Sequence, residues 1–309
     1  MVFVAAILDR ALSGLYATPV KRCVFCKTDL SGPGVTATVE HIVPQWLQRE
    51  WGLQSHNISP THSDSRGNVI SSRSHGLSAF VAGNVCDGCN NGWMSALEVA
   101  SKPLILDLAG GRRRVIDLAD NEALLLARWT AKTAYALHAS ANYRRIVPEN
   151  HYQVFDTPDY RLPVGVGVVA HTYKSGKDFS WSQTTNWHCL AVDGTSASDM
   201  EAIRTSGYKI AVKLGGLFLM IFHNPVAHSR ETLVFGKHIP LYPRWPHPVT
   251  WMRMPGPWPG REMVRFHAFV QLLGIAFGAH DPDSPFATKD GVSLDGPPLR
   301  IDAETGEPL

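Results

Sequence analysis

The sequence predicts an α+β fold in three consecutive parts: a small metal-held N-terminal module, a helical connector and an antiparallel, β-rich C-terminal region. Three observations predict it. Two Cys-x-x-Cys pairs enclose residues 23–89. Apolar residues recur at helical spacing across residues 121–140. Beyond about residue 150 the apolar period changes to two, which is typical of strands.

Length and composition agree with a folded chain of more than one part. With 309 residues, 44% of them hydrophobic, the chain is long enough to bury a sizeable core. Its formal net charge of +2 argues against both intrinsic disorder and a strongly basic surface. We place the module at residues 20–110, the connector at 111–145, the β-rich domain at 146–280 and a mobile tail at 281–309.

Cysteine usage indicates the compartment. Four of the five cysteines fall into the two pairs, and Cys189 stands alone. A secreted, disulfide-stabilised domain has denser and more evenly spread cysteines, so we expect a reducing, cytoplasmic location. The apolar segment Met1–Leu8 lacks a positively charged leader and is too short to span a bilayer. No membrane partner is therefore expected.

The elements of the module follow one another closely. Val35–Val43 is rich in β-branched residues and predicts a strand, and Gln45–Trp51 predicts a short helix after it. Residues 54–78 are polar and predict a long loop. After the last cysteine pair we expect a helix over residues 90–101, which Pro103 interrupts.

The C-terminal half reads as strands framed by two helices. The long connector helix is expected over residues 121–140. Strands are expected over residues 164–173, 179–192, 208–214 and 217–223. Gly215-Gly216 predicts a tight hairpin between the last two strands. A final amphipathic helix is expected from about Arg261, with Phe277 on its apolar face.

The two cysteine pairs predict a structural zinc site. Its expected ligands are Cys23, Cys26, Cys86 and Cys89. Each pair presents two thiolates at the spacing of a zinc knuckle, and structural zinc takes four such ligands. A redox motif or a pair of buried thiols could explain one Cys-x-x-Cys pair, but two such pairs in a cysteine-poor chain are hard to explain in that way. Because four thiolates leave no open coordination position, this zinc is expected to fold the site and not to catalyse.

An acid-histidine pair, Glu40-His41, lies between the two halves of the zinc site and is followed by Ile42-Val43-Pro44. The arrangement resembles the HNH endonuclease family, a branch of the ββα-metal nucleases, in its members with a four-cysteine zinc. Those read Cys-x-x-Cys, an acid-His-Ile/Val-x-Pro strand, and Cys-x-x-Cys followed by His or Asn on a helix. Asn90 holds that last position. Segments 89–98 and 127–134 also resemble a bacterial subgroup, so the resemblance covers roughly residues 20–140.

The resemblance implies a ββα-metal (HNH) module that hydrolyses nucleic-acid phosphodiesters with the help of a metal, DNA being the expected substrate. His41 would be the general base that activates water, since histidine exchanges protons near neutral pH. Glu40 and Asn90 would give oxygen ligands to one divalent cation such as Mg²⁺. Because Glu40 and His41 are adjacent on a strand, both serve one site only if the strand is strained or bulged.

Two positions of the family pattern have more than one candidate. The family's middle asparagine orients the loop that carries the base. We assign this role to Asn84, with Asn68 as the alternative. On the helix, Asn91 could exchange roles with Asn90.

Nucleic acid is the expected partner, in first place double-stranded DNA, and cleavage of both strands by one site would favour a homodimer. Arg128 and Lys132 lie four residues apart on one helix face and are candidates for phosphate contacts. The run Arg112–Arg114 is more typical of a solvated turn. Two other functions stay open: a zinc-stabilised protein that binds nucleic acid without cutting it, and a toxin or defence effector that a partner activates.

Overall fold

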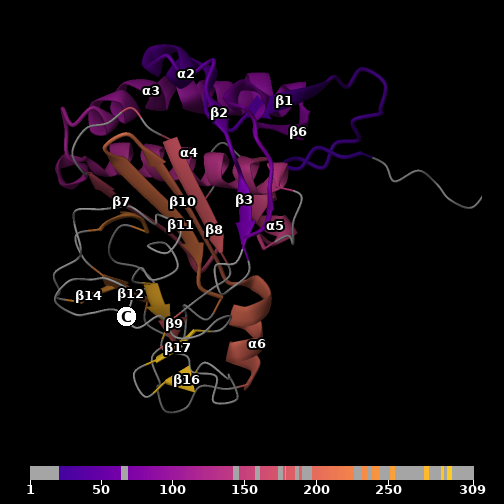
Figure 1. Cartoon of the computed structure of the whole chain (residues 1–309). Helices are drawn as coiled ribbons and strands as arrows, with labels where there is room; N and C mark the ends of the chain where they lie inside the picture. The colour runs from indigo at the N-terminus through magenta and orange to yellow at the C-terminus, as the bar shows by residue number, and fades with distance from the viewer. Residues whose placement is uncertain are drawn as a thin grey trace, which may run out of the picture.

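The computed structural model has a mixed α+β architecture, as predicted. It describes residues 21–63, 69–141, 146–156, 161–172, 177, 179–184, 188–189, 197–225, 232–235, 238–243, 251–254, 275–277, 287–288 and 291–293. A layer of helices and short strands from the N-terminal part covers one long helix, which in turn covers a five-stranded sheet (Figure 1). The order of the layers follows the order of the chain.

The N-terminal module consists of two antiparallel strands followed by a helix. β1 (Ala37–His41) pairs with β6 (Val81–Cys86). After β6 the chain makes a wide π-helical turn over Gly88–Met94 and continues as α3 (Ser95–Ala109). The predicted strand and the predicted helix after the cysteines are therefore both present, although the regular helix begins later and ends later than expected.

Pro103 does not interrupt α3, and this corrects the prediction. A proline inside a helix leaves the carbonyl four residues earlier, here that of Val99, without its usual partner. Val99 is 73% exposed, so water can satisfy that carbonyl. On the opposite face Ile105 and Leu108 are fully buried, and their burial favours continuation of the helix to Ala109.

The polar stretch between β1 and β6 is not an irregular loop, contrary to the prediction. α2 (Gln45–Trp51) forms where a helix was expected. β2 (Asn57–Ile58) then pairs with β5 (His75–Gly76), and β3 (Thr61–Ser63) pairs with β4 (Val69–Ser72) inside them. The two nested ladders make one long interrupted ribbon. Backbone groups of the paired strands hydrogen-bond to one another, and such pairing does not depend on apolar side chains.

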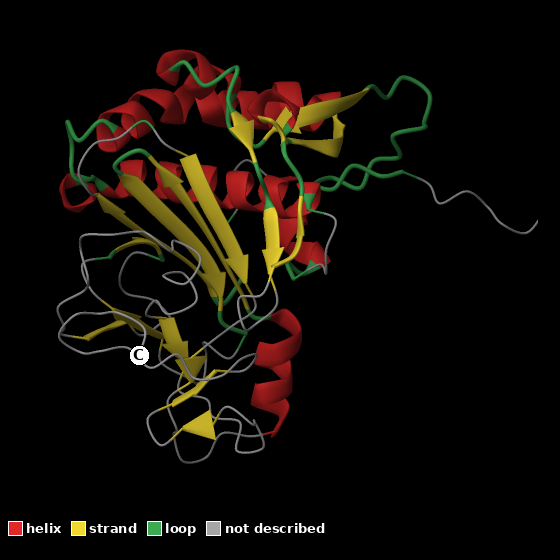
Figure 2. Cartoon of the chain, in the orientation of Figure 1, coloured by secondary structure: helices red, strands yellow, loops and turns green. Residues whose placement is uncertain are grey.

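α4 (Asp120–Ser140) confirms the predicted long helix and is the central element of the molecule. Figure 2 shows α2, α3 and α4 on one side of the five-stranded sheet, with α4 next to it. Thirteen of its 21 residues are buried, on several faces of the helix. A helix that is buried all round belongs to an interior rather than to a surface. No helix in the described part of the chain is long and apolar enough to cross a membrane.

The five-stranded sheet is antiparallel throughout, with the strand order β13-β7-β11-β10-β8. Its strands are β7 (Val166–Thr172), β8 (Phe179–Thr184), β10 (Tyr208–Leu214), β11 (Leu217–His223) and β13 (Ile239–Tyr242). Every residue of β11 is buried, so this strand is covered on both faces. Gly215, at φ 54°, adopts the left-handed conformation that the predicted hairpin turn requires.

Shorter elements complete the described chain. They are the helices α5 (Glu149–Tyr152) and α6 (Ala197–Ser206) and a six-stranded sheet of β12 (Thr232–Phe235), β14 (Trp251–Met254), β15 (Ile275–Phe277), β9 (His188–Cys189), β17 (Gly291–Ser293) and β16 (Ala287–Thr288). The predicted final helix falls on residues 261–274, outside the described residues, and Phe277 at its end lies in a strand. The predicted mobile tail, 281–309, also lies outside them apart from β16 and β17.

One hydrophobic core joins the cysteine region to the sheet. The ring of Phe25, within the first cysteine pair, packs edge-on against Tyr152 of α5 at 5.8 Å between centroids. Tyr152 lies 5.4 Å from Tyr135 of α4, whose hydroxyl is 2.8 Å from that of Tyr208 in β10. The core therefore crosses the expected boundaries near residues 110 and 145, which remain predictions.

Candidate functional site

The four predicted cysteines form one cluster. Their sulfur atoms all lie within 4.8 Å of one another, and the Sγ atoms of Cys26 and Cys86 are 3.5 Å apart. Sulfur ligands about 2.3 Å from a tetrahedral zinc are separated by about 3.8 Å. Among the described residues this is the one group of three or more His, Cys, Asp or Glu side chains close enough to share a metal ion. The cluster is consistent with the predicted structural zinc.

Local backbone geometry builds the first half of the cluster. The amide of Lys27 donates to the carbonyl of Cys23 at 2.9 Å and closes the turn between the paired cysteines. Lys27 has φ 64°, a left-handed conformation that costs a non-glycine residue about 1–2 kcal/mol. Its ammonium contacts the carboxylate of Glu149 at 2.5 Å, so the strained turn is also tied to α5. The amide of Cys86 points at Cys23 Sγ from 3.4 Å, as expected for a group that stabilises a thiolate.

The thiols influence one another's protonation. The hydrogen bond from Cys89 holds the pKa of Cys23 down to about 4, and the same contact, with burial, raises the pKa of Cys89. Burial raises the pKa of Cys86 to about 11. The contact between Cys23 and Cys89 therefore favours the thiolate of Cys23 over that of Cys89. A bound divalent metal would supply the positive charge that four adjacent thiolates need.

His41 is the last residue of β1 and is half-buried. Its Nε2 lies 3.2 Å from the side-chain amide nitrogen of Gln45 in the first turn of α2. Which of the two groups donates depends on the tautomer of the imidazole and on the orientation of the amide. In either arrangement Gln45 fixes the plane of the ring. Sequence reasoning missed Gln45, although its spacing of four residues from His41 was visible.

A bulge lies in β6, opposite the strand that carries the acid-histidine pair. Gly83 and Asn84 together stand opposite the single residue Val39, and regular pairing resumes at Glu40 and His41. Because the bulge precedes them, the two side chains still alternate: that of Glu40 is buried, and that of His41 is half-buried. The irregularity is therefore present, but it does not bring both side chains to one face.

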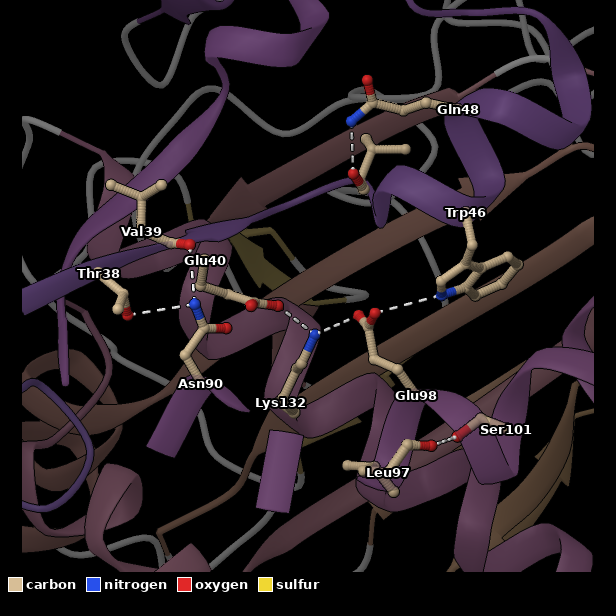
Figure 3. A network of polar contacts seen from close by, with 11 residues as sticks. Thr38, Val39, Glu40, Trp46, Gln48, Asn90, Leu97, Glu98, Ser101 and Lys132 are labelled. Atoms are coloured by element: carbon tan, nitrogen blue, oxygen red, sulfur yellow. Dashed lines mark hydrogen bonds and ion pairs between the residues drawn. The ribbon is translucent and has the colours of Figure 1, made fainter. Parts of the chain in front are cut away.

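Asn84 and Asn90 hold the module together through different groups. Asn84, whose side chain is exposed, accepts a backbone hydrogen bond from Val24 of the first cysteine pair at 2.8 Å. The side-chain nitrogen of Asn90 donates to Thr38 Oγ1 at 3.1 Å and to the carbonyl of Val39 at 3.0 Å (Figure 3). This pair of bonds fastens the start of the helical segment to β1.

The alternatives for the asparagine roles differ in position. The exposed side chain of Asn91 donates to Asp87 at 2.6 Å and makes no hydrogen bond to β1 among the described residues. The other alternative, Asn68, lies outside the described residues. In Figure 3 the amide oxygen of Asn90 is turned toward the carboxylate of Glu40. Asn90, and not Asn91, therefore lies beside Glu40.

The carboxylate of Glu40 forms a buried ion pair with Lys132 of α4. Lys132 is 1% exposed and also contacts Glu98 of α3 at 2.6 Å. The second carboxylate oxygen of Glu98 accepts a hydrogen bond from the indole of Trp46 in α2 at 3.2 Å. Lys132 was predicted as a phosphate contact. Its burial between two carboxylates corrects that prediction, because phosphate has no access to the ammonium group.

Burial and charge act in opposite directions in this cluster. Burial disfavours the charged form of Lys132, but the carboxylates of Glu98 and Glu40 outweigh it, and the pKa of Lys132 lies above its ordinary value. Burial raises the pKa of Glu40 and Lys132 lowers it, with burial the larger influence. With all three groups ionised the cluster carries one net negative charge. No sequence signal links Glu40 to Lys132, which lie 92 positions apart.

The basic run after α3 is a solvated turn, as predicted. Each arginine has an acidic partner nearby in the sequence: Arg112 with Asp107 at 2.8 Å, Arg113 with Glu122 at 2.7 Å, and Arg114 with Asp117 at 2.9 Å. Bidentate contact with Arg113 lowers the pKa of Glu122 to about 2. These guanidinium groups are already used to hold the turn at the start of α4.

No protein-family model, curated protein or solved structure matches this chain. The cluster of four cysteines that could bind a metal ion is therefore a finding about this chain alone. Any activity has to be argued from the site itself, that is, from the chemistry of the residues around β1 and the start of the helix.

Proposed function

We propose that this protein is a metal-dependent endonuclease of the HNH type, which hydrolyses phosphodiester bonds in nucleic acid, with DNA as the substrate. The observation that carries the proposal is that three residues of the family pattern, His41, Glu40 and Asn90, lie on one strand-strand-helix unit. His41 and Glu40 end one strand, and Asn90 begins the helical segment and is bonded to that strand. The cysteine cluster lies at the junction of the second strand and the helical segment.

His41 is the general base in this proposal. The side-chain amide nitrogen of Gln45 can donate to His41 Nε2, so Nε2 carries the lone pair that a general base needs to remove a proton from water. A half-buried ring at the end of a strand can meet both water and a phosphate group. Gln45 acts by holding the ring in the plane that the transfer needs.

Glu40 and Asn90 are the residues that would hold a divalent cation. In Figure 3 the amide oxygen of Asn90 is turned toward the carboxylate of Glu40, and oxygen atoms of these two kinds are ligands that Mg²⁺ prefers. Lys132 occupies one carboxylate oxygen of Glu40 and leaves the other for the cation. When bound, the cation offsets the negative charge that grows on the phosphate and on the leaving oxygen. Mg²⁺ suits two protein oxygens because it keeps several waters.

The test is a plasmid-nicking assay on purified protein with Mg²⁺ or Mn²⁺, against the same reaction with EDTA. We expect His41→Ala to lower the nicking rate at least 100-fold, the usual minimum for loss of a general base, and to keep its zinc. His56→Ala is the matched control, because His56 is exposed on the same insertion and has no place in the proposed site. Zinc content, measured by mass spectrometry, shows that each variant is folded around its cysteines.

One observation favours a second function, a zinc-stabilised protein that binds nucleic acid without cutting it. The carboxylate that would hold the cation is already paired with the ammonium of Lys132. This reading predicts that wild-type protein and His41→Ala bind DNA equally well, and that neither cuts DNA or RNA. If zinc-loaded protein binds DNA but does not nick it with either Mg²⁺ or Mn²⁺, this second function replaces the endonuclease proposal.

A further inference from the structure

We propose that Lys132 is the positioning residue for Glu40 and sets the affinity of the cation site for its divalent metal, with Glu98 as its second anchor. This inference rests on the proposed endonuclease function. It concerns α4, which lies outside the strand-strand-helix unit. It also assigns a role to the two residues of the buried cluster, Lys132 and Glu98, that the proposed reaction itself does not use.

Lys132 is buried and reaches Glu40 from α4, a helix outside the strand-strand-helix unit. Its ammonium contacts Glu40 of β1 and Glu98 of α3, and Trp46 of α2 donates to Glu98 (Figure 3). One buried ammonium therefore holds the strand and helices around the proposed site. Because it contacts one oxygen of Glu40, it fixes the direction of the other, toward Asn90.

A purely structural role explains this arrangement poorly. Removing the charged groups of Lys132 and Glu40 from water is costly, and well-packed apolar residues often stabilise a fold as well as a buried ion pair does. Here buried Lys132 and Glu40 meet a half-buried Glu98, next to the amide oxygen of Asn90 and the proposed cation site. The net charge of the cluster, one negative, then determines how strongly that position attracts a divalent cation.

Lys132 and Glu98 should have opposite effects on cation binding. Lys132→Met keeps the length of the side chain but removes the positive charge, so the cluster becomes more negative and attracts the cation more strongly. Glu98→Gln keeps the shape but removes a negative charge, so the cluster becomes neutral and attracts the cation less. We expect the Mn²⁺ affinity to rise about tenfold in the first variant and to fall about tenfold in the second, within the usual range of coupling between sites.

The rate of nicking tests whether Lys132 positions Glu40, in addition to changing the charge of the cluster. With Mn²⁺ at saturation, Lys132→Met should nick DNA at least about tenfold more slowly than wild type although it binds the cation more tightly, because Glu40 is no longer held in place. A merely structural role would not combine tighter binding with slower cleavage. Glu98→Gln should recover most of its rate when Mn²⁺ is raised, because its lysine still holds Glu40.

The experiment is a titration of zinc-loaded, full-length protein with Mn²⁺, in which free Mn²⁺ is followed by electron paramagnetic resonance. Glu40→Gln should abolish the site and so identifies the binding event. Lys213→Met on β10 is the matched control for the substitution itself, since Lys213 is half-buried in the five-stranded sheet. Zinc content and circular dichroism test the folding of every variant.

The outcomes separate this inference from the proposed function. If wild type nicks DNA and depends on His41, but both Lys132→Met and Glu98→Gln bind Mn²⁺ within twofold of wild type, only the role of Lys132 is overturned. If wild type neither binds Mn²⁺ nor nicks, both proposals fall. Should Lys132→Met lose its zinc, Glu98→Gln decides alone, and unchanged affinity in that variant overturns the inference.

Discussion

The cysteine module and the five-stranded sheet hold their structures by different means. The module has one pair of strands, β1 and β6, and such a small sheet is at best marginally stable on its own in water. A cluster of four cysteines lies at its centre. In the sheet, β11 is buried along its whole length without any metal-ligating cluster among the described residues. A metal bound to the cysteines would therefore add to the hydrophobic core that the module shares with the sheet.

α4 lies between these two regions and meets each of them with different chemistry. Toward the module it presents the ammonium of Lys132, which is paired with carboxylates from β1 and α3. Toward the sheet it presents the hydroxyl of Tyr135, bonded to Tyr208, within a cluster of aromatic rings. The comparison teaches that one helix can belong to a charged site on one face and to a core on another.

The largest effect is expected from loss of the metal. Cys86→Ser should lose bound zinc and lower the free energy of unfolding by more than about 5 kcal/mol, because metal binding and folding of such sites are coupled. Zinc content and urea-induced unfolding measure the two quantities. Cys189→Ser is the matched control, since Cys189 belongs to neither Cys-x-x-Cys pair, and it should keep the zinc. Full zinc occupancy in Cys86→Ser would contradict the assignment of the ligands.

A cavity in the sheet should have a smaller effect of a different kind. Leu219 of β11 is fully buried, and Leu219→Ala should lower the free energy of unfolding by about 2–5 kcal/mol through lost contacts and the space left behind. We expect the zinc content to stay at the wild-type level. If zinc is released together with sheet structure at the same urea concentration, the two regions unfold as one unit and the contrast between them is weaker than we infer.

The smallest effect at neutral pH, and a growing one in acid, is expected at His151 of α5. Its ring is 3% exposed, lies 2.9 Å from the hydroxyl of Tyr208 and faces His223 at 4.6 Å. Burial, with a contribution from His223, lowers the pKa of His151 from 6.5 to about 3. Below pH 6.5 His151 takes up a proton in the unfolded chain but stays neutral in the folded chain. The free energy of unfolding therefore falls between pH 6.5 and pH 3.

The matching variant, His151→Gln, removes this titration. Its free energy of unfolding should fall less steeply than that of wild type over the same interval, by at most about 1.4 kcal/mol per pH unit. Zinc release in acid affects both proteins alike, so the difference between the two curves isolates His151. If the free energies of unfolding of the two proteins change in parallel from pH 7 to pH 4, His151 takes up its proton in the folded state and the prediction is contradicted.

Local signals were sufficient for much of the fold. The helix Gln45–Trp51, the long helix near 121–140 and the hairpin around Gly215 were predicted from residue type and spacing, and the structure has all three. The predictions went wrong where tertiary context overrides a local rule. α3 continues past Pro103 because its apolar face is buried, and the polar insertion forms a ribbon because its backbone groups pair with one another.

The candidate site divides in the same way. Spacing identified the four cysteines, and the resemblance of the sequence to the HNH family singled out His41, Glu40 and Asn90 as expected site residues. It could not show that Glu40 pairs with Lys132, that Asn90 rather than Asn91 reaches β1, or that the bulge lies in β6.

The sequence by itself therefore determined the four cysteines of the cluster, the helices α2, α3 and α4, the strand β1 and four of the five strands of the antiparallel sheet, because spacing and propensity act within a few residues. Only the tertiary structure decided which distant groups meet. Residues 40, 98 and 132 come together because α4 is packed between the module and the sheet, and that packing depends on the whole chain at once. For that reason the buried charge cluster behind the proposed site has no counterpart in any local pattern.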